Sequence, residues 1–275
     1  MPSPVSKLFL PSPVLAGCVF AAIYRDTRGV PLSDKDRVNH FPASPLVSIT
    51  RVISGRLAVL PSVPVSDCAP SEAEAPSLFV MGPQEAPVSS WSPGDVCAIS
   101  LGFYHDAWLH LGGDPAFRHV PQGLADALDQ FADAAGSEQG WSRLCTVLEA
   151  EWIERRPQGW SGLSGIADWA QAALTRAAMA GPGRSLRALE RRLKRMSGQT
   201  RRSLAFYSAF ENLHRVANRD LGEPLAEIAL ASGYADQSHM GRAVRRATGF
   251  TPARLNQAIK TEEPFWCYRL LDERF

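Results

Sequence analysis

The sequence predicts a two-domain α+β protein, with a β-rich N-terminal domain carrying flanking helices and an all-α C-terminal domain with tandem helix-turn-helix units. Three observations predict this division. The 275 residues exceed the roughly 100–200 residues of one domain. Apolar residues follow a strand-like pattern early in the chain and helical spacing after Pro121, and basic residues gather in the second half. We expect domains over residues 1–160 and 161–262, then an amphipathic tail over 263–275.

Runs of Val, Ile and Leu in the first hundred residues are typical of strands. The candidates are Val14–Tyr24, Leu46–Leu60, Ser77–Met81 and Val96–Phe103. Ser54-Gly55 supplies a turn inside the second run, and Pro61–Pro76 is rich in Pro, Ser and acidic residues. We therefore expect a sheet region interrupted by an exposed loop.

Two helices are predicted after Pro121 from apolar stripes at helical spacing. The first stripe is Leu124, Leu128, Phe131 and Ala135, ending at Gly136, and the second is Trp141, Leu144, Cys145, Leu148 and Trp152, ending before Pro157. Packing against the sheet is the favoured interpretation, and pairing with a second copy of the chain is the alternative. Gly159–Gly165 is the expected linker to the second domain.

Composition excludes several classes of protein. No apolar run approaches the roughly 18 residues of a membrane span, and no secretory signal is expected at the N-terminus. The five cysteines are odd in number and widely spaced, which argues against a disulfide framework and a zinc site. These features favour a reduced, cytoplasmic compartment.

The net charge of +1 hides a strong asymmetry. Residues 182–260 hold 15 Lys and Arg residues against 6 Asp and Glu, a net charge of +9, so the remainder carries −8. Most of these cations are arginines, which suit phosphate and base-edge contacts. The asymmetry favours a nucleic-acid-binding domain joined to one that does not bind nucleic acid.

The basic half contains an internal repeat with an offset of 51 residues. Leu189–Thr200 aligns with Met240–Thr251, which pairs Arg191 with Arg242 and the stop glycine Gly198 with Gly249. Upstream at the same offset, Ser185 pairs with Asp236, and both are strong N-cap residues. Each copy therefore predicts a helix of about 12 residues, from its cap to a glycine in the left-handed conformation.

The second copy is preceded by a short apolar helix over Pro224–Ala231 and a turn at Ser232-Gly233-Tyr234. One face of the second copy is apolar, and the other carries Gln237, Ser238, Gly241, Arg242 and Arg245. A helix, a glycine-containing turn and a capped helix with a polar outer face predict a helix-turn-helix unit. A plain helical hairpin is the alternative.

Leu225–Arg254 closely resembles the C-terminal signature of the AraC/XylS family of bacterial transcription regulators. The shared marks are I-A-L-A-x-G-Y, D-Q-S-H, R-A-x-R-R with T-G, and the closing T-P. Ser185–Gly198 is similar to the family's first recognition helix. The resemblance implies two helix-turn-helix units joined by a long helix over about Arg201–Asn218, which place their recognition helices in successive major grooves about 34 Å apart.

The resemblance also implies roles for individual residues. Base contacts fall on Gln237, Ser238, Gly241 and Arg242 in the second unit and on Arg187, Glu190 and Arg191 in the first. Phosphate contacts fall on Lys194, Arg195, Arg245 and Arg246. Glu190 either accepts from a cytosine amino group or is simply solvated. One departure is that Gly181-Pro182-Gly183 breaks any helix before Ser185, so the supporting helix of the first unit either lies within Ala167–Ala180 or is missing.

The N-terminal half carries no comparable motif. Trp91, Phe103, Tyr104 and Trp108 suit either the wall of an apolar effector pocket or the core. His105, His110 and His119, with Asp106 and Asp114, match no zinc spacing, and motifs typical of hydrolases, proteases and nucleotide-binding proteins do not occur. We expect no metal and no cofactor, and we expect Cys267 to pack in a terminal amphipathic helix.

We therefore expect a cytoplasmic, sequence-specific transcription regulator that binds double-stranded DNA and is not an enzyme. Its N-terminal domain senses a small-molecule effector or mediates dimerisation, and the expected partners include a second copy of the chain and RNA polymerase, but no membrane. Two rival hypotheses remain. One is an N-terminal enzyme targeted to DNA, and the other is a protein-interaction module that has lost DNA binding.

Overall fold

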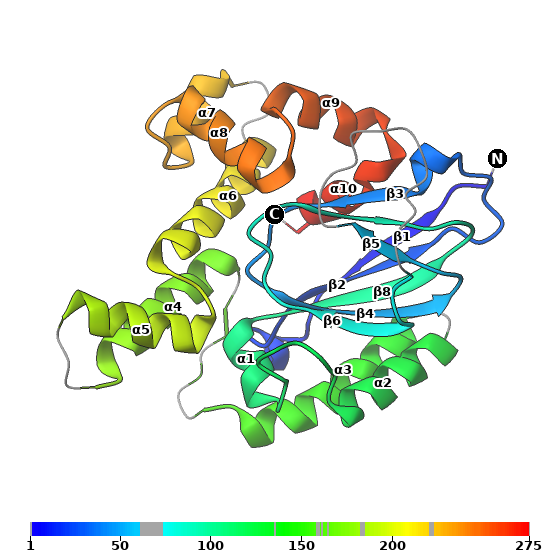
Figure 1. The fold of residues 1–275 in the computed structure, drawn as a ribbon, viewed down its shortest axis with the longest axis horizontal. Coiled ribbons are helices and arrows are strands. Elements are labelled where there is room, and N and C mark those ends of the chain that lie inside the picture. Colours follow the sequence, from blue (N-terminus) through cyan, green and yellow to red (C-terminus); the bar gives the residue numbers. More distant parts are fainter. Residues whose placement is uncertain are drawn as a thin grey trace.

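The computed structural model describes residues 2–60, 74–134, 136–157, 160, 162–163, 165–181, 185–219 and 223–274. Within these residues, a region of two β-sheets with helices on one side precedes a helical C-terminal region (Figure 1). The predicted fold class is confirmed. Much of the predicted loop Pro61–Pro76, together with parts of the linker and of Gly181-Pro182-Gly183, lies outside the described residues. None of the described helices has the length and apolar character needed to cross a membrane.

Five antiparallel strands form the larger sheet, in the order β1-β2-β8-β4-β6, and three form the smaller, in the order β3-β7-β5. Their bounds are β1 Val5–Phe9, β2 Val19–Asp26, β3 Val38–Phe41, β4 Val47–Ser54, β5 Ala58–Leu60, β6 Leu78–Met81, β7 Val88–Trp91 and β8 Cys97–Phe103. The predicted run Leu46–Leu60 is divided at Gly55, which has φ +83°. Its two halves, β4 and β5, therefore belong to different sheets.

Three helices lie on the outer side of the larger sheet, namely α1 His105–His110, α2 Gln122–Asp133 and α3 Glu138–Arg155 (Figure 1). Phe131 of α2 packs edge-on against Phe9 and Tyr24, and Trp141 of α3 stacks on Phe9 at 5.3 Å between ring centroids. The apolar stripes of α2 and α3 are therefore used in packing against the sheet, as the favoured interpretation predicts.

The described residues of the C-terminal region form helices and connecting turns, with no strand among them. Its helices are α4 Ile166–Met179, α5 Leu186–Ser197, α6 Arg201–Arg219, α7 Leu225–Ala231, α8 Gln237–Thr248, α9 Pro252–Thr261 and α10 Trp266–Asp272. Short 3-10 turns are η1 Pro13–Leu15, η2 Asp34–Arg37 and η3 Glu263–Phe265. The long helix expected over about Arg201–Asn218 is thus present as α6.

The internal repeat is visible in the backbone. Helices α5 and α8 each span 12 residues at the predicted offset. The Ser185 hydroxyl accepts from the Ala188 N–H and the Asp236 carboxylate accepts from the His239 N–H, so both predicted N-caps form. Gly198 and Gly249 end the two helices at φ +68° and +83°, where a residue with a Cβ is strained.

The correspondence extends to the hydrogen bonds after each helix. In the first copy, Ser197 donates to the Leu193 carbonyl and accepts from the Gln199 N–H. In the second copy, Thr248 donates to the Val244 carbonyl and accepts from the Phe250 N–H. The hydroxyls of Ser197 and Thr248, at the same repeat position, therefore stabilise the same turn after each helix.

The first unit has one supporting helix, α4, which packs on both α5 and α6. Its buried face is Trp169, Ala170, Ala173 and Ala177. The guanidinium of Arg192 on α5 donates to the carbonyl of Ala177, which ties the two helices together. The supporting helix therefore coincides with the predicted segment Ala167–Ala180.

The helical region returns to the sheets at its end. Helix α10 contacts β1 and β3, and the indole N–H of Trp266 donates to the Asn39 side-chain oxygen at 2.7 Å. The backbone N–H of Ala43 donates to the carbonyl of Ala247, the penultimate residue of α8, also at 2.7 Å. The second helix-turn-helix unit is thus held directly against the β region.

The stop glycines generate a stability prediction. Gly249→Ala places a Cβ in the left-handed region, which costs about 1–2 kcal/mol, so the free energy of unfolding should fall by about that amount. Gly241→Ala lies inside α8 where an added Cβ meets nothing within 4 Å, and it should raise the free energy of unfolding by about 0.5–1 kcal/mol. Denaturant midpoints of the full chain test this, and shifts of the same sign would contradict it.

Candidate nucleic-acid interface and ligand cavity

Helix α8 presents a sharply divided surface. Met240, Ala243, Val244 and Ala247 are buried against the rest of the unit. Gln237, Ser238 and Arg242 are exposed on the outer side, and Gly241 is half-buried among them. The structure therefore brings the predicted base-contacting residues of the second unit onto one accessible face. Their contacts with bases stay predictions.

Helix α5 repeats this arrangement. Leu193 is fully buried, whereas Arg187, Glu190 and Arg191 are exposed. Lys194 and Arg195 of α5, and Arg245 and Arg246 of α8, are exposed as well. The guanidinium of Arg246 lies 4.2 Å from the ring centroid of Phe206 on α6, so this cation is oriented by an aromatic face while it stays accessible.

One exposed residue of α5 is not among the predicted contact residues. Leu186 opens α5 and is 72% exposed, at the repeat position that Gln237 occupies in α8. Extending the repeat alignment upstream by three residues identifies it. The two copies therefore present different chemistry at their first turns, one apolar and one amide.

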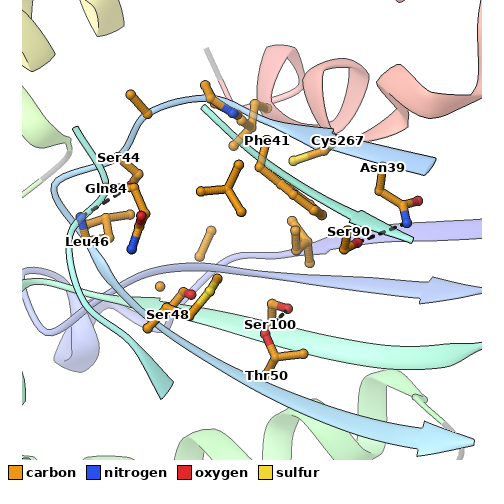
Figure 2. Close-up of a pocket in the computed structure, with 18 of the residues that line it drawn as sticks. Asn39, Phe41, Ser44, Leu46, Ser48, Thr50, Gln84, Ser90, Ser100 and Cys267 are labelled. Carbon is orange, nitrogen blue, oxygen red and sulfur yellow. Dashed lines mark hydrogen bonds between the residues drawn. The ribbon is translucent and has the colours of Figure 1, made fainter. Parts of the chain in front are cut away.

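A second feature is a cavity of about 240 Å³ between the two sheets (Figure 2). Small residues on the inward side of the larger sheet leave this space. One cross-strand row is Ala21, Gly102, Ser48 and Met81, and the next is Ile23, Ser100, Thr50 and Phe79. Opposite them, the smaller sheet contributes Asn39, Phe41, Val59, Val88 and Ser90.

The remaining wall of the cavity is helical. Helix α6 contributes Tyr207, Phe210, Glu211 and His214, which are spaced i, i+3, i+4 and i+7 and therefore share one face. Helix α10 contributes Trp266, Cys267 and Leu271. The helix that joins the two helix-turn-helix units thus also closes the cavity.

The four aromatic residues predicted for an effector pocket lie elsewhere. Phe103 at the end of β8, Tyr104 next to it and Trp108 of α1 are fully buried in the core, and neither they nor Trp91 line the cavity. Large rings fill space, so they pack the core, whereas the cavity lies over small side chains. These aromatics therefore do not form the wall of this cavity, and their assignment to an effector pocket stays a prediction.

Polar groups around the cavity are mostly paired with each other. The hydroxyls of Thr50 and Ser100 lie 2.7 Å apart, and the Asn39 amide donates to the Ser90 hydroxyl at 3.1 Å (Figure 2). Burial raises the pKa of the Cys267 thiol to about 12, so this thiol stays protonated and is a poor nucleophile.

Glu211 links the cavity to the first helix-turn-helix unit. Its buried carboxylate accepts from the backbone N–H groups of Ile166 and Ala167, both at 2.8 Å. These are the first residues of α4, where free N–H groups and the helix dipole favour a negative charge. A side chain of α6 therefore caps the helix that supports α5.

The histidine and aspartate cluster considered for a metal has structural contacts instead. His105 pairs with the Met196 carbonyl, and Asp106 accepts from the Trp169 indole and forms an ion pair with Arg176. Over the part of the chain that the structure describes, no group of three His, Cys, Asp or Glu residues is placed to hold a metal ion.

His40 lies where the β region meets the second unit. Its ring is 5.4 Å from that of Phe250 and 4.9 Å from that of Phe265, and its Nδ1 lies 2.9 Å from the Ser89 hydroxyl. Burial lowers the pKa of His40 to about 4, with a smaller lowering from Arg254 opposed by Glu262. The contact therefore requires the neutral imidazole.

This generates a pH prediction. The unfolded chain protonates His40 near pH 6.5 and the folded chain only near pH 4, so stability falls as the pH is lowered through this window. At pH 5 the loss is about 2 kcal/mol. Denaturant midpoints at pH 7 and 5 should differ less in His40→Phe than in the wild type. The exposed His119→Phe should keep the wild-type difference, and an unchanged difference in His40→Phe would contradict the assignment.

Comparisons with known proteins bear on the helical region. Residues 180–258 match the protein-family model described as "Helix-turn-helix domain". No curated protein matches the sequence. Among solved structures, the chain is similar to ToxT from Vibrio cholerae O395, with a TM-score of 0.40 and 11% identity, covering 92% of this chain and 96% of that one. ToxT from the same strain bound to (E)-4-(8-methylnaphthalen-1-yl)but-3-enoic acid gives a TM-score of 0.40 and 11% identity, covering 92% and 98%.

A much weaker similarity is to YcfD, a ribosomal oxygenase from Escherichia coli, with a TM-score of 0.22 and 14% identity over 51% of this chain and 40% of that one. The matched segment 180–258 contains α5 to α8 and most of α9, which are the capped, duplicated helices described above. The C-terminal region of this chain therefore contains a helix-turn-helix domain.

Proposed function

We propose that the chain is a sequence-specific transcription regulator that reads double-stranded DNA with α5 and α8. The observation that carries this proposal is the pair of equivalent recognition surfaces, with Arg191 and Arg242 exposed at the same repeat position. Helix α6 joins them, and its 19 residues span about 28 Å at 1.5 Å per residue. This length is of the same order as the roughly 34 Å between successive major grooves on one side of DNA.

The cavity is the proposed effector site. Because α6 forms one of its walls, an occupant touches the helix that connects the two recognition units. A ligand that binds one arrangement of α6 more tightly than another shifts the population of that arrangement and hence the affinity for DNA. The activity is binding rather than catalysis, since Cys267 is held as a thiol and Glu211 is occupied in capping α4.

Further parts of the proposal concern organisation and partners. We propose the domain division at residues 160 and 262, a cytoplasmic location, and RNA polymerase as a partner of the DNA-bound chain. A homodimer is also proposed. Val147 and Ile153, which remain exposed on α3 after the apolar stripe has packed on the sheet, support a contact there.

The recognition surface is tested with a duplex selected from a random DNA library. Arg242→Ala should weaken binding by about 1–3 kcal/mol and relax preference at one base position, because a bidentate base contact is lost. Arg245→Ala should weaken binding to all sequences. It should also reduce by about one the salt slope, which is the slope of log binding constant against log salt concentration. The wild-type slope should correspond to about 5–8 phosphate contacts.

The control for these variants is Lys35→Ala, which removes an exposed cation from η2 in the acidic half of the chain. It should leave affinity and salt slope unchanged. Wild-type affinity and selectivity in Arg242→Ala would show that α8 is not the recognition helix, and a flat salt response would favour the protein-interaction module.

The role of Glu211 gives a separate prediction. Glu211→Gln removes the charge that caps α4, and hydrogen bonds to charged groups contribute about 1.5–3 kcal/mol, so the free energy of unfolding should fall by about that amount. Because α4 supports α5, base preference should relax at the positions read by α5 and persist at those read by α8. Site selection with each variant measures this, with the exposed Glu227→Gln on α7 as control. Equal relaxation at both sets of positions would contradict the prediction.

A further inference from the structure

We propose that the cavity between the sheets takes an uncharged, mainly apolar ligand with one or two hydroxyl or carbonyl groups. This rests on the proposed function only in naming the cavity as the effector site. The inference comes from the charges and shape of the cavity wall. The proposed ligand class can therefore be wrong while the DNA-binding proposal holds, and the reverse.

The charged groups of the described wall already have partners. The guanidinium of Arg25 pairs with Glu263, donates to the Ser6 hydroxyl at 2.6 Å and lies 5.0 Å from the Trp266 ring centroid. Both carboxylate oxygens of Glu211 are bound to the start of α4. Nδ1 of His214 lies 3.1 Å from an oxygen of Asp272.

A charged ligand therefore meets no uncompensated opposite charge among these lining residues. Burying a carboxylate or an ammonium without such a partner is strongly unfavourable. A carboxylate would also approach the buried Glu211, and an ammonium would approach the buried Arg25. The wall thus selects against both signs of charge.

The remaining polar groups of the wall are neutral, and they lie on both sheets, with Asn39 and Ser90 on the smaller one. Ser48, Thr50 and Ser100 project from β4 and β8 into the floor of the cavity (Figure 2). A hydroxyl both donates and accepts, so these side chains suit a ligand hydroxyl or carbonyl. The rest of the wall is apolar and includes Ile23, Phe41, Phe79, Val88 and Phe210. The ligand is therefore amphipathic without being ionic.

The size of the cavity sets the scale of the occupant. Its volume of about 240 Å³ exceeds that of an engineered cavity of roughly 150 Å³ that holds benzene. The space depends on small inward residues such as Ala98, Ser100 and Gly102 on one strand. A two-ring compound or an alcohol of about ten carbons is of a suitable size.

The test uses the full chain and Nile red, an uncharged fluorescent probe, displaced by 1-decanol or by decanoate at pH 7.5. We expect 1-decanol to displace the probe at a concentration at least tenfold lower than decanoate. Ser100→Leu and Ala98→Leu, which fill the cavity, should each weaken probe binding at least tenfold. Ser142→Leu, which adds the same side chain to the exposed side of α3, should not. A cooperative unfolding transition in denaturant verifies that each variant is folded.

A gain-of-function variant tests whether decanoate binds weakly because of its charge or only because it is less hydrophobic than 1-decanol. Glu263→Gln removes the carboxylate that neutralises Arg25, so decanoate affinity should rise at least fivefold while 1-decanol affinity stays unchanged. Wild-type decanoate binding as tight as that of 1-decanol would overturn the proposal, as would decanoate affinity unaffected by Glu263→Gln. Probe binding that survives both cavity-filling variants would show that the probe binds elsewhere and would also overturn it.

Discussion

Helix α6 has to satisfy two sets of neighbours at once, and the rest of the structure depends on this constraint. One face carries Tyr207, Phe210, Glu211 and His214 and closes the cavity between the sheets. Helix α5 precedes the start of α6, and α7 and then α8 follow its end. Because the same helix lines the cavity and packs on α4, α7 and α8, packing on the cavity side and placement of the DNA-binding surfaces are not independent.

The two helix-turn-helix units are coupled to the β region in different ways. The first unit is connected through a charge, since the Glu211 carboxylate caps α4. The second unit is connected through packing and one backbone hydrogen bond, with His40 between Phe250 and Phe265 and the Ala43 N–H on the Ala247 carbonyl. An electrostatic contact and a neutral aromatic contact respond to different conditions, so the units need not be held with equal strength in every state.

The recognition helices were predictable from sequence because their determinants are local. A cap residue, an apolar stripe and a stop glycine lie within 14 residues of each other, so Ser185 and Gly198, and likewise Asp236 and Gly249, mark the helix ends directly. The cavity was not predictable in this way. Its floor depends on the cross-strand register that brings Ala21, Gly102 and Ser48 into one row, and sequence periodicity does not encode pairing between distant strands. Large aromatic residues such as Trp108 fill the core, whereas this cavity lies over small side chains.

Helix α10 also bears on how the chain is synthesised. Trp266, Cys267 and Leu270 form a cluster that covers Leu8, Ile23 and Phe41 on the first strands. During translation the β region emerges first, and these apolar side chains stay uncovered until α10 has left the ribosome. The interval spans the whole helical region, so this apolar face of the β region is uncovered while the DNA-binding helices are still being made.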